Sequence, residues 1–361
     1  MQAIAKVSKS AIINNYTYFK KIQGKNTIIP VVKADAYGHG AIEVARILIE
    51  SFKLSTFAVA TLEEAEMLSD QFPIIDILIF SKIFKAELPR IRRNFIISII
   101  SLDDFNLVQS WNHTYNLRCH INFNTGMNRL GLKYDAFLAV ELLIDNQIMI
   151  EGIYSHYATS DEVDTRYYLH QQNEFRKIAL HFLKNGFDGL IHISNSASGI
   201  RETCKYSNAL RLGIGLYGYD MNIHNGLRPN LKQVLSLEAP VVAVFQVKKN
   251  ESVSYGQKWF ATEVTTIATL RIGYADGFSR LLSSKAKAMF KGDIFDIVGT
   301  ITMDHVMVDI KTANIKVGDY FTLYGTSHED ISIYTISEKL KTIPYEITCA
   351  ISSRVKRMVV E

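Results

Sequence analysis

Cysteines and long apolar runs are scarce in this sequence. Its 361 residues include three cysteines, which are odd in number, far apart and without metal-ligand spacing: Cys119, Cys204 and Cys349. This pattern excludes a disulfide scaffold, and we expect buried thiols, a reducing compartment and no metal. No apolar segment approaches the roughly 20 residues that a membrane-spanning helix needs. Residues 1–9 lack the apolar stretch of a secretory signal, so we expect a cytoplasmic protein without a membrane partner.

An excess of one charge is also missing. The 40 lysines and arginines and the 36 aspartates and glutamates give a formal net charge of +4, spread without long basic runs. This balance argues against nucleic acid as the main partner but leaves a modest attraction for anionic small molecules. The length is sufficient for two domains with substantial cores.

The segment from Val31 to Gly40, VVKADAYGHG, carries the most chemical information. Lys33 stands at the end of an apolar β-type run, and a loop with a tyrosine, a histidine and two glycines follows it directly. A lysine on a rigid strand end beside a desolvated pocket becomes a nucleophilic amine suited to Schiff-base chemistry. A side chain that extends into solvent is the usual alternative for such a lysine, but here the flanking sequence favours the nucleophile.

From residue 28 to about residue 212, apolar β-rich runs alternate with amphipathic stretches such as 42–50 and 166–183. This alternation predicts βαβ units and a parallel sheet. Eight such units close a TIM (β/α)8 barrel. The predicted strands are Ile28–Val32, Thr56–Ala60, Ile74–Phe80, Phe95–Ile100, Leu117–Asn122, Ile148–Tyr154, Ile191–Ser194 and Ala209–Leu212.

After about Lys232 the pattern changes to β-branched runs separated by Gly, Asp and Ser turns, which predicts a mostly-β second domain. Only Ile331–Lys341 is predicted to be helical. We expect domains at residues 8–230 and 231–361, joined at Leu227–Asn230, with the opening strand Ala3–Val7 pairing with the second domain. The predicted strands of that domain are Val241–Val247, Glu263–Ile272, Ile294–Thr302, His305–Ile310 and Tyr320–Tyr324.

Several polar side chains fall at the carboxyl ends of the predicted barrel strands. This is the face on which barrel enzymes hold their catalytic residues, so we expect one candidate site there. The side chains are Lys33 after the first strand, Arg129 after the fifth, His156 after the sixth, Asn195 and Ser196 after the seventh, and Arg211 at the end of the eighth.

These motifs and their order resemble the alanine racemase family of pyridoxal-phosphate enzymes. After the lysine motif come, in the family's order, Thr125–Gly131, Tyr154–Thr159, His192–Ala197, Arg211–Gly218, Ile272–Gly277 and the pair Met303-Asp304. The matches extend from near residue 4 to near residue 357. Because so many motifs occur in the family's order, the resemblance is specific. The resemblance implies a fold-type III isomerase with an N-terminal TIM barrel and a mostly-β C-terminal domain.

The resemblance also implies how pyridoxal 5'-phosphate is held. Lys33 forms the covalent link to the cofactor. Backbone N–H groups of Gly213 and Ile214, after strands seven and eight, are expected to hold the phosphate. The hydroxyl groups of Ser196 and Tyr37 would add further donors.

Arg211 is expected to face the pyridine nitrogen, where it donates a hydrogen bond and disfavours a second proton. Racemisation needs an acid/base group on each face of a planar carbanion. The resemblance assigns Lys33 to one face and Tyr274, supplied by the partner subunit, to the other. His156, with Arg211 behind it, forms the network that favours the tyrosine phenolate. Asn195 completes the cofactor-binding set.

The substrate carboxylate is expected to bind Arg129 and the Met303 N–H, with Asp304 as a supporting residue. In the family Tyr274 and Met303 come from the second domain of the other chain, so the resemblance implies a homodimer with shared active sites. The product D-alanine would serve peptidoglycan synthesis.

Three positions depart from the family pattern. Asn122 stands where a carbamylated lysine usually orients the arginine, and Asn124 stands where an aspartate is common. We hypothesise that Arg129 is held by the Asn122 amide or by a bound anion such as chloride. Ser353 replaces a tyrosine that often shapes the pocket, so a serine racemase or one of broader specificity is an alternative to an alanine racemase.

Other classes of protein can be compared with this pattern. A decarboxylase of the same fold would carry a glycine-rich phosphate motif and a cysteine donor in its second domain, and neither is found. A non-catalytic pyridoxal-phosphate-binding protein has a single barrel, so the region after Lys232 counts against it. A metabolic barrel enzyme without the cofactor would yield a colourless protein.

Overall fold

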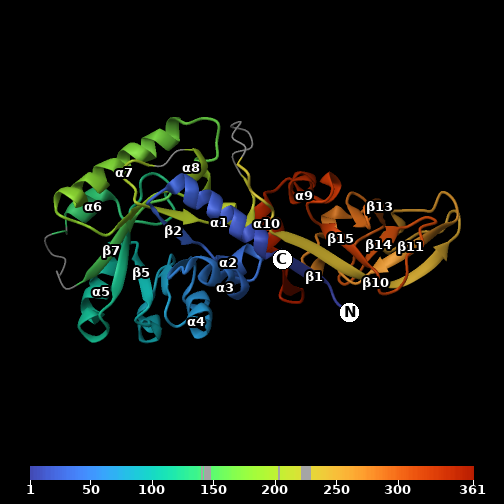
Figure 1. The fold of residues 1–361 in the computed structure, drawn as a ribbon, viewed down its shortest axis with the longest axis horizontal. Helices are drawn as coiled ribbons and strands as arrows, with labels where there is room; N and C mark the ends of the chain where they lie inside the picture. The colour runs from blue at the N-terminus through green and yellow to red at the C-terminus, as the bar shows by residue number, and fades with distance from the viewer. Residues whose placement is uncertain (140, 142–147, 202–203, 221–228) are drawn as a thin grey trace. The chain divides into compact units, whose positions relative to one another are not determined.

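The computed structural model describes residues 1–139, 141, 148–201, 204–220 and 229–361 (Figure 1). The chain divides into two compact units. The barrel unit comprises Ile12–Ala36 and Val44–Lys232, and the β unit comprises Met1–Ala11, Tyr37–Glu43 and Gln233–Glu361. The predicted joint, 227–230, lies partly outside the described residues, which do not include 227 and 228.

Eight parallel strands close the barrel unit into a ring. Strands β3 to β8 form one sheet in chain order, and β9 pairs with β2. Two isolated bridges complete the ring, Val31 with Ala58 and Ser194 with Leu210. The predicted (β/α)8 barrel is therefore confirmed. Its strands are β2 (Thr27–Pro30), β3 (Thr56–Val59), β4 (Asp76–Ile79), β5 (Phe95–Ile99), β6 (Arg118–Asn122), β7 (Met149–Tyr154), β8 (Leu190–His192) and β9 (Ala209–Leu212).

Helices connect these strands and lie outside them (Figure 1). In α7 the buried residues include Tyr168, Phe175, Ile178 and Phe182, a spacing that gives one apolar face for packing on the sheet. Among the described residues, none of the helices has both the length and the apolarity to cross a membrane. The helical segments along this part of the chain are α1 (Lys9–Gln23), α3 (Ala41–Phe52), α4 (Leu62–Gln71), η1 (Lys85–Arg90), α5 (Leu102–Tyr115), α6 (Tyr134–Leu138), α7 (Arg166–Lys184), α8 (Ser196–Arg201) and η3 (Ile214–Tyr217).

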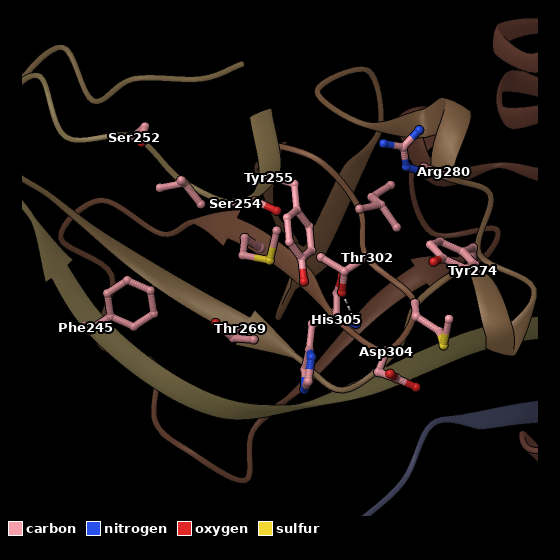
Figure 2. Close-up of a pocket in the computed structure, with 14 residues that line it drawn as sticks. Phe245, Ser252, Ser254, Tyr255, Thr269, Tyr274, Arg280, Thr302, Asp304 and His305 are labelled. Atoms are coloured by element: carbon pink, nitrogen blue, oxygen red, sulfur yellow. Dashed lines mark hydrogen bonds between the residues drawn. The ribbon is translucent and has the colours of Figure 1, made fainter. Parts of the chain in front are cut away.

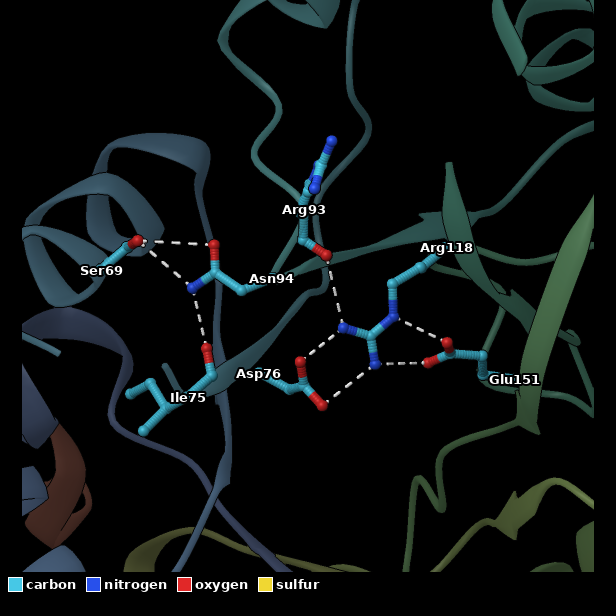
Figure 3. Close-up of polar contacts among 7 residues, drawn as sticks. All are labelled: Ser69, Ile75, Asp76, Arg93, Asn94, Arg118 and Glu151. Carbon is cyan, nitrogen blue, oxygen red and sulfur yellow. Dashed lines mark hydrogen bonds and ion pairs between the residues drawn. The ribbon is translucent and has the colours of Figure 1, made fainter. Parts of the chain in front are cut away.

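Arg118, the first residue of β6, joins the amino end of that strand to β7, its neighbour, and to β4, which lies beyond β5 (Figure 3). Its guanidinium forms paired hydrogen bonds with Asp76 at the start of β4 and with Glu151 of β7. The Nη2 distances are 3.0 Å to Asp76 Oδ2 and 2.9 Å to Glu151 Oε2. In barrel enzymes this end of the ring serves stability, whereas the opposite end holds the catalytic residues.

The β unit is built on a ring of antiparallel strands. The order is β11, β14, β13, β12, β15 and β10, and pairing of β10 with β11 closes it. The opening strand β1 pairs with β10 and with β16. A core of buried residues that includes Val247, Ile267 and Val298 fills part of the unit. Its elements are β1 (Ile4–Ser8), β10 (Leu235–Val247), β11 (Thr265–Leu270), β12 (Lys287–Phe290), β13 (Asp293–Val298), β14 (Val306–Asp309), β15 (Tyr320–Tyr324), α9 (Ile333–Leu340), α10 (Pro344–Cys349) and β16 (Lys356–Val360).

Some expectations for this unit are wrong. The elements β12, β16 and α10 were not predicted from the sequence. All three are short, β16 begins Lys-Arg, and α10 begins at a proline. The strand predicted to end at Thr302 ends at Val298, because Gly299 turns the chain with φ +68°. Cys119 and Cys204 are buried as expected, but Cys349 is exposed, since it lies at the end of the short helix α10.

Candidate active site

The predicted site residues of the barrel unit lie at the carboxyl ends of its strands. Because the strands are parallel, these ends form one rim of the ring. Lys33 lies shortly beyond β2, and Arg211 lies within the last part of β9. The others are Arg129 after β6, His156 after β7, and Asn195 and Ser196 after β8.

The backbone after Lys33 makes a left-handed turn, α2 (Lys33–Tyr37). Ala34, Asp35, Ala36 and Tyr37 all have φ between 52° and 55°. A non-glycine residue in this conformation costs about 1–2 kcal/mol. Such strain persists only where the surroundings fix it, and it occurs preferentially at functional sites.

Glu64 of α4 holds the start of this turn. Its Oε1 accepts the backbone N–H of Ala34 at 2.6 Å, and its Oε2 accepts the backbone N–H of Ala60 at 2.7 Å. Glu64 also completes the capping box of α4 with Thr61. One carboxylate therefore joins the turn after Lys33 to the end of β3.

Arg211 is buried, with 3% of its surface exposed. Its Nη1 donates to Nδ1 of His192 at 2.7 Å and to the His192 carbonyl at 3.0 Å. Its Nη2 donates to the carbonyl oxygen of Ser155 at 2.6 Å, to Nδ1 of His156 at 3.0 Å and to the Ile193 carbonyl at 3.2 Å. This set of bonds holds the guanidinium in one orientation.

The same bonds fix the tautomers of three histidines. Because arginine can only donate, Nδ1 of His192 and Nδ1 of His156 accept, and each neutral ring carries its hydrogen on Nε2. His192 Nε2 then donates to Nδ1 of His120, 3.0 Å away. Burial, followed by the charge of Arg211, lowers the pKa of His120 to about 3 and the pKa of His192 well below its usual value.

His156 lies within electrostatic reach of three cations. Burial is the largest cause that lowers its pKa, and the charges of Arg211, Arg129 and Lys33 lower it further. The structure thus brings His156 near the two predicted cations of the rim as well as against Arg211. The imidazole is neutral at ordinary pH.

Ser196 and the turn after β9 form a cluster of hydrogen-bonding groups. The hydroxyl oxygen of Ser196 accepts the N–H of Gly213 at 3.0 Å and the N–H of Gly215 at 3.1 Å. A Cβ at Gly215 would lie 2.6 Å from the ring of Phe19, so the turn requires glycine there. Ile214 lies between the two glycines. Backbone N–H groups and a hydroxyl gathered at one turn suit the binding of an anion.

Two other predicted cofactor residues have structural partners. Asn195 Oδ1 accepts the backbone N–H of Ser198 at 3.0 Å and the hydroxyl of Ser160 at 2.9 Å, which caps the start of α8. Tyr37 belongs to the β unit, where its ring centre lies 5.8 Å from that of Tyr345.

The loop after β6 presents Arg129 to solvent. Asn124 organises the loop, because its Oδ1 accepts two backbone N–H groups at 3.0 Å and 3.1 Å. Within the described part of the chain, Arg129 makes no hydrogen bond or ion pair. Asn122 is buried at the end of β6, and among the described residues no hydrogen bond joins its side chain to Arg129.

The remaining predicted residues line a cavity of about 980 Å³ in the β unit (Figure 2). Tyr274, Met303 and Asp304 lie on neighbouring loops at its wall. Tyr274 is 42% exposed and Met303 is 52% exposed. Both side chains are therefore accessible at a concave surface of this unit.

Two sequence profiles together match almost the whole chain. The profile described as the N-terminal domain of alanine racemase matches residues 7–221, and the profile for the C-terminal domain matches residues 234–359. The chain belongs to the alanine racemase family. The alanine racemase of Methanococcus maripaludis is 36% identical to it over 365 residues, which cover 98% of this chain and 97% of that protein.

Solved structures of the alanine racemase family share this fold. The alanine racemase of Clostridium difficile 630 superposes with a TM-score of 0.91 at 32% identity, covering 100% of this chain and 96% of that one. The alanine racemase of Bartonella henselae, solved with covalently bound pyridoxal phosphate, has a TM-score of 0.86 at 29% identity and 100% coverage of both chains. The barrel and the mostly-β part are thus those of the family.

Several residues that contact the predicted site were not predicted from the sequence. His192 lies in a quoted motif but had no role, and His120 had no signal beyond its strand. Glu64 could have been found from the capping-box sequence Thr61-Leu-Glu-Glu64. Arg354, whose Nη2 lies 2.7 Å from Oδ1 of Asp304, had no signal, because that partner is 50 residues away in the sequence.

Proposed function

We propose that this member of the alanine racemase family is a pyridoxal-phosphate-dependent isomerase that interconverts L-alanine and D-alanine. The observation that carries the proposal is the arrangement of Lys33, Arg211 and the Ser196 turn at one rim of the barrel. The relatives named alanine racemase, and the homologous structure with covalently bound pyridoxal phosphate, support it.

The residues of the rim fit this cofactor. Its aldehyde, phosphate and ring nitrogen require an amine, a set of N–H and O–H donors, and one further hydrogen-bond donor. Lys33 supplies the amine, and Arg211 supplies the guanidinium. The Ser196 hydroxyl and the Ile214 N–H supply donors, and the Gly213 N–H, which donates to Ser196 Oγ in this structure, would turn to the phosphate. Asn195 completes the set at the rim, and the Tyr37 hydroxyl is proposed as a further donor. When bound, pyridoxal phosphate withdraws electrons from the α-carbon of an amino acid, so that its proton can leave.

Arg211 adapts the site to racemisation. Its guanidinium keeps its charge at all ordinary pH values, so it would donate to the ring nitrogen of the bound cofactor and disfavour a second proton there. The hydrogen bonds to His192 and Ser155 hold its plane. Weaker electron withdrawal limits side reactions, which suits an enzyme that only removes and returns one proton.

Two bases act on opposite faces of the α-carbon. The amine of Lys33 would hold the proton on one face, and the phenolic oxygen of Tyr274 of the partner subunit would hold it on the other. From L-alanine the tyrosine takes the proton and Lys33 delivers one; from D-alanine the roles exchange. His156, neutral and hydrogen-bonded through Nδ1 to Arg211, directs its Nε2–H to the phenolic oxygen.

The substrate carboxylate binds Arg129 and the N–H of Met303, with Asp304 in support. Asn122 cannot be carbamylated, so Arg129 is held by the Asn122 amide or by a bound anion such as chloride. Ser353 gives the pocket more room than the usual tyrosine. A serine racemase, or one of broader specificity, is the second candidate.

The assembly follows from these assignments. Because Tyr274 and Met303 act on a substrate that is bound at the barrel of the other chain, the enzyme is a homodimer with shared active sites. It works in the cytoplasm and supplies D-alanine for peptidoglycan. The 980 Å³ cavity beside Tyr274 and Met303 supports the view that this face receives another surface.

The test begins with the colour of the purified protein. We expect visible absorption that borohydride bleaches, with the reduced cofactor recovered on the peptide that carries Lys33. Proton–deuterium exchange at the α-carbon of alanine, serine and larger amino acids then ranks the substrates. A colourless protein contradicts the cofactor assignment, and bound cofactor without D-alanine formation contradicts the function. Faster exchange with serine than with alanine favours the second candidate.

A further inference from the structure

Two loops of the β unit are bound to each other along their backbones. One carries Tyr274 and the other carries Met303. The Tyr274 N–H donates to the carbonyl oxygen of Thr302, and the Ala275 N–H donates to that of Met303, each at 3.1 Å. A Cβ at Gly273 would lie 2.2 Å from the Met303 carbonyl oxygen. The loops therefore form one closely packed pair.

Arg354 joins the carboxylates of these two loops. Its Nε lies 3.1 Å from Oδ1 of Asp276, in the Tyr274 loop, and its Nη2 lies 2.7 Å from Oδ1 of Asp304, in the Met303 loop. The second oxygen of Asp276, Oδ2, accepts the N–H of Gly273 at 2.9 Å. One guanidinium thus bridges both loops, and one of its partners closes the turn that contains the tyrosine.

This bridge contributes little to the free energy of unfolding. The side chains of Arg354 and Asp304 are 51% and 47% exposed, and exposed ion pairs contribute at most about 1 kcal/mol. The side chain of Asp276 is only 9% exposed, so it is a fixed point from which Arg354 extends to Asp304. The bridge therefore restricts the relative position of the loops more than it stabilises the fold.

We propose that Arg354 is a positioning residue for racemisation, because it fixes the Tyr274 loop relative to the Met303 N–H. The inference rests on the proposed function, in which one subunit places its tyrosine and its Met303 N–H on the same substrate. Catalysis requires such groups to be placed within a fraction of an ångström of each other. The arginine fork suits this task, since Nε and Nη2 have a fixed spacing that a lysine ammonium lacks.

Four variants of the holoenzyme test the proposal. Arg354→Met removes both ion pairs, and Arg354→Lys keeps the charge without the fork. Asp304→Asn removes only the exposed pair and leaves the buried Asp276 paired, so it keeps the test valid if Arg354→Met does not fold. Arg90→Met is the matched control, because Arg90 is 40% exposed and bridges Glu63 and Glu66 in the barrel unit.

The decisive measurement is the α-deuterium isotope effect on kcat/KM in each direction. The two enantiomers have equal free energy, so kcat/KM changes equally in both directions and only the isotope effect shows which proton transfer has slowed. For Arg354→Met we expect kcat to fall roughly tenfold or more. The isotope effect should rise for L-alanine, from which Tyr274 takes the proton, and fall for D-alanine. Arg354→Lys should recover part of the loss, and Asp304→Asn should show the same pattern with a smaller change.

Hydrogen exchange provides a second readout. The backbone N–H groups of Gly273 and Ala275 should exchange faster in Arg354→Met than in the parent, and Arg90→Met should leave them unchanged. Parental isotope effects in both Arg354→Met and Asp304→Asn would overturn the positioning role. If Tyr274→Phe, measured in parallel, leaves both directions intact, the two-base assignment itself fails; if only Tyr274→Phe is impaired, the positioning role alone fails.

Discussion

Arg211 controls the protonation of its surroundings with a charge that it does not lose. Its donors fix the Nδ1 atoms of His192 and His156 as acceptors, and through His192 they also fix His120. These imidazoles are buried beside a cation, so protonation is disfavoured twice. At the scale of single residues, one guanidinium thus sets three tautomers.

The first prediction concerns stability at low pH. The folded-state pKa of His120, His156 and His192 lies below the unfolded value near 6.5, and for His120 it is about 3. Below pH 6.5 the unfolded chain therefore binds more protons than the folded protein does. The part of the free energy of unfolding that depends on these neutral imidazoles is present above pH 6.5 and is lost as the pH falls towards 3. Each group contributes a slope of about 1.4 kcal/mol per pH unit. Urea midpoints between pH 7 and pH 5 measure it.

A matched variant isolates one histidine. His120→Asn should reduce this pH slope by roughly one proton, because it removes one group with a depressed pKa. The slope, rather than the absolute stability, is the quantity to compare. An unchanged slope would show that His120 does not stay neutral in the folded protein.

At the scale of elements, the backbone after Lys33 shows how surroundings can override local preference. Ala34 and Ala36 have no preference for positive φ, and the sequence predicted only a loop there. The carboxylate of Glu64 fixes the N–H of Ala34. Long-range contact, rather than residue type, therefore selects this turn.

The second prediction uses this strain. Ala34 is exposed with φ 52°, so Ala34→Gly should relieve the backbone strain. Glycine also gives the unfolded chain more conformational entropy, which offsets part of this gain. The free energy of unfolding should therefore rise by about 0.5–1 kcal/mol. Ala86, an exposed residue of the helical turn η1, is the control. Ala86→Gly should lower stability by a similar amount. Thermal unfolding measures both, and a decrease in both variants would contradict the account of strain.

The third prediction concerns the opposite ends of the strands. Arg118 is 22% exposed and pairs with Asp76 and Glu151. Arg118→Met leaves two partly buried carboxylates without their partner, so it should lower stability by roughly 1–3 kcal/mol. The kcat per folded molecule should not change, because the network lies at the amino ends of the strands. Urea unfolding combined with active-site titration checks this, and a loss of kcat at full folding would be inconsistent with it.

At the scale of the whole molecule, the proposed function needs two copies of the chain. Lys33 belongs to the barrel unit and Tyr274 belongs to the β unit. If each site takes Lys33 from one copy and Tyr274 from the other, two inactive variants can complement each other.

The fourth prediction is that complementation. Lys33→Ala and Tyr274→Phe should each have little activity alone. When they are unfolded together and refolded at equal amounts, half of the dimers are mixed and carry one intact site of two. The mixture should then recover about one quarter of the parental activity, by random association. Gel filtration of each variant is the control, and no recovery from well-folded mixed dimers would contradict the sharing of sites.

The sequence predicted the order of the elements well where each segment carries its own pattern. The barrel strands from Thr27 to Leu212 alternate with amphipathic helices, and that periodicity is local. Strand β16 was missed because two of its five residues, Lys356 and Arg357, are charged, and it forms only by pairing with β1. Prediction failed where an element depends on its partner.

By itself, the sequence determined the kind of fold and the rim on which Lys33 and Arg211 lie, because strand ends and motif positions are local properties. Only the tertiary structure decided which groups meet there. The chain of hydrogen bonds from Arg211 to His120 crosses three strands, and Arg354 reaches Asp304 across 50 residues of sequence. No local pattern encodes such contacts, since they arise only when packing brings distant strands and loops within hydrogen-bonding distance.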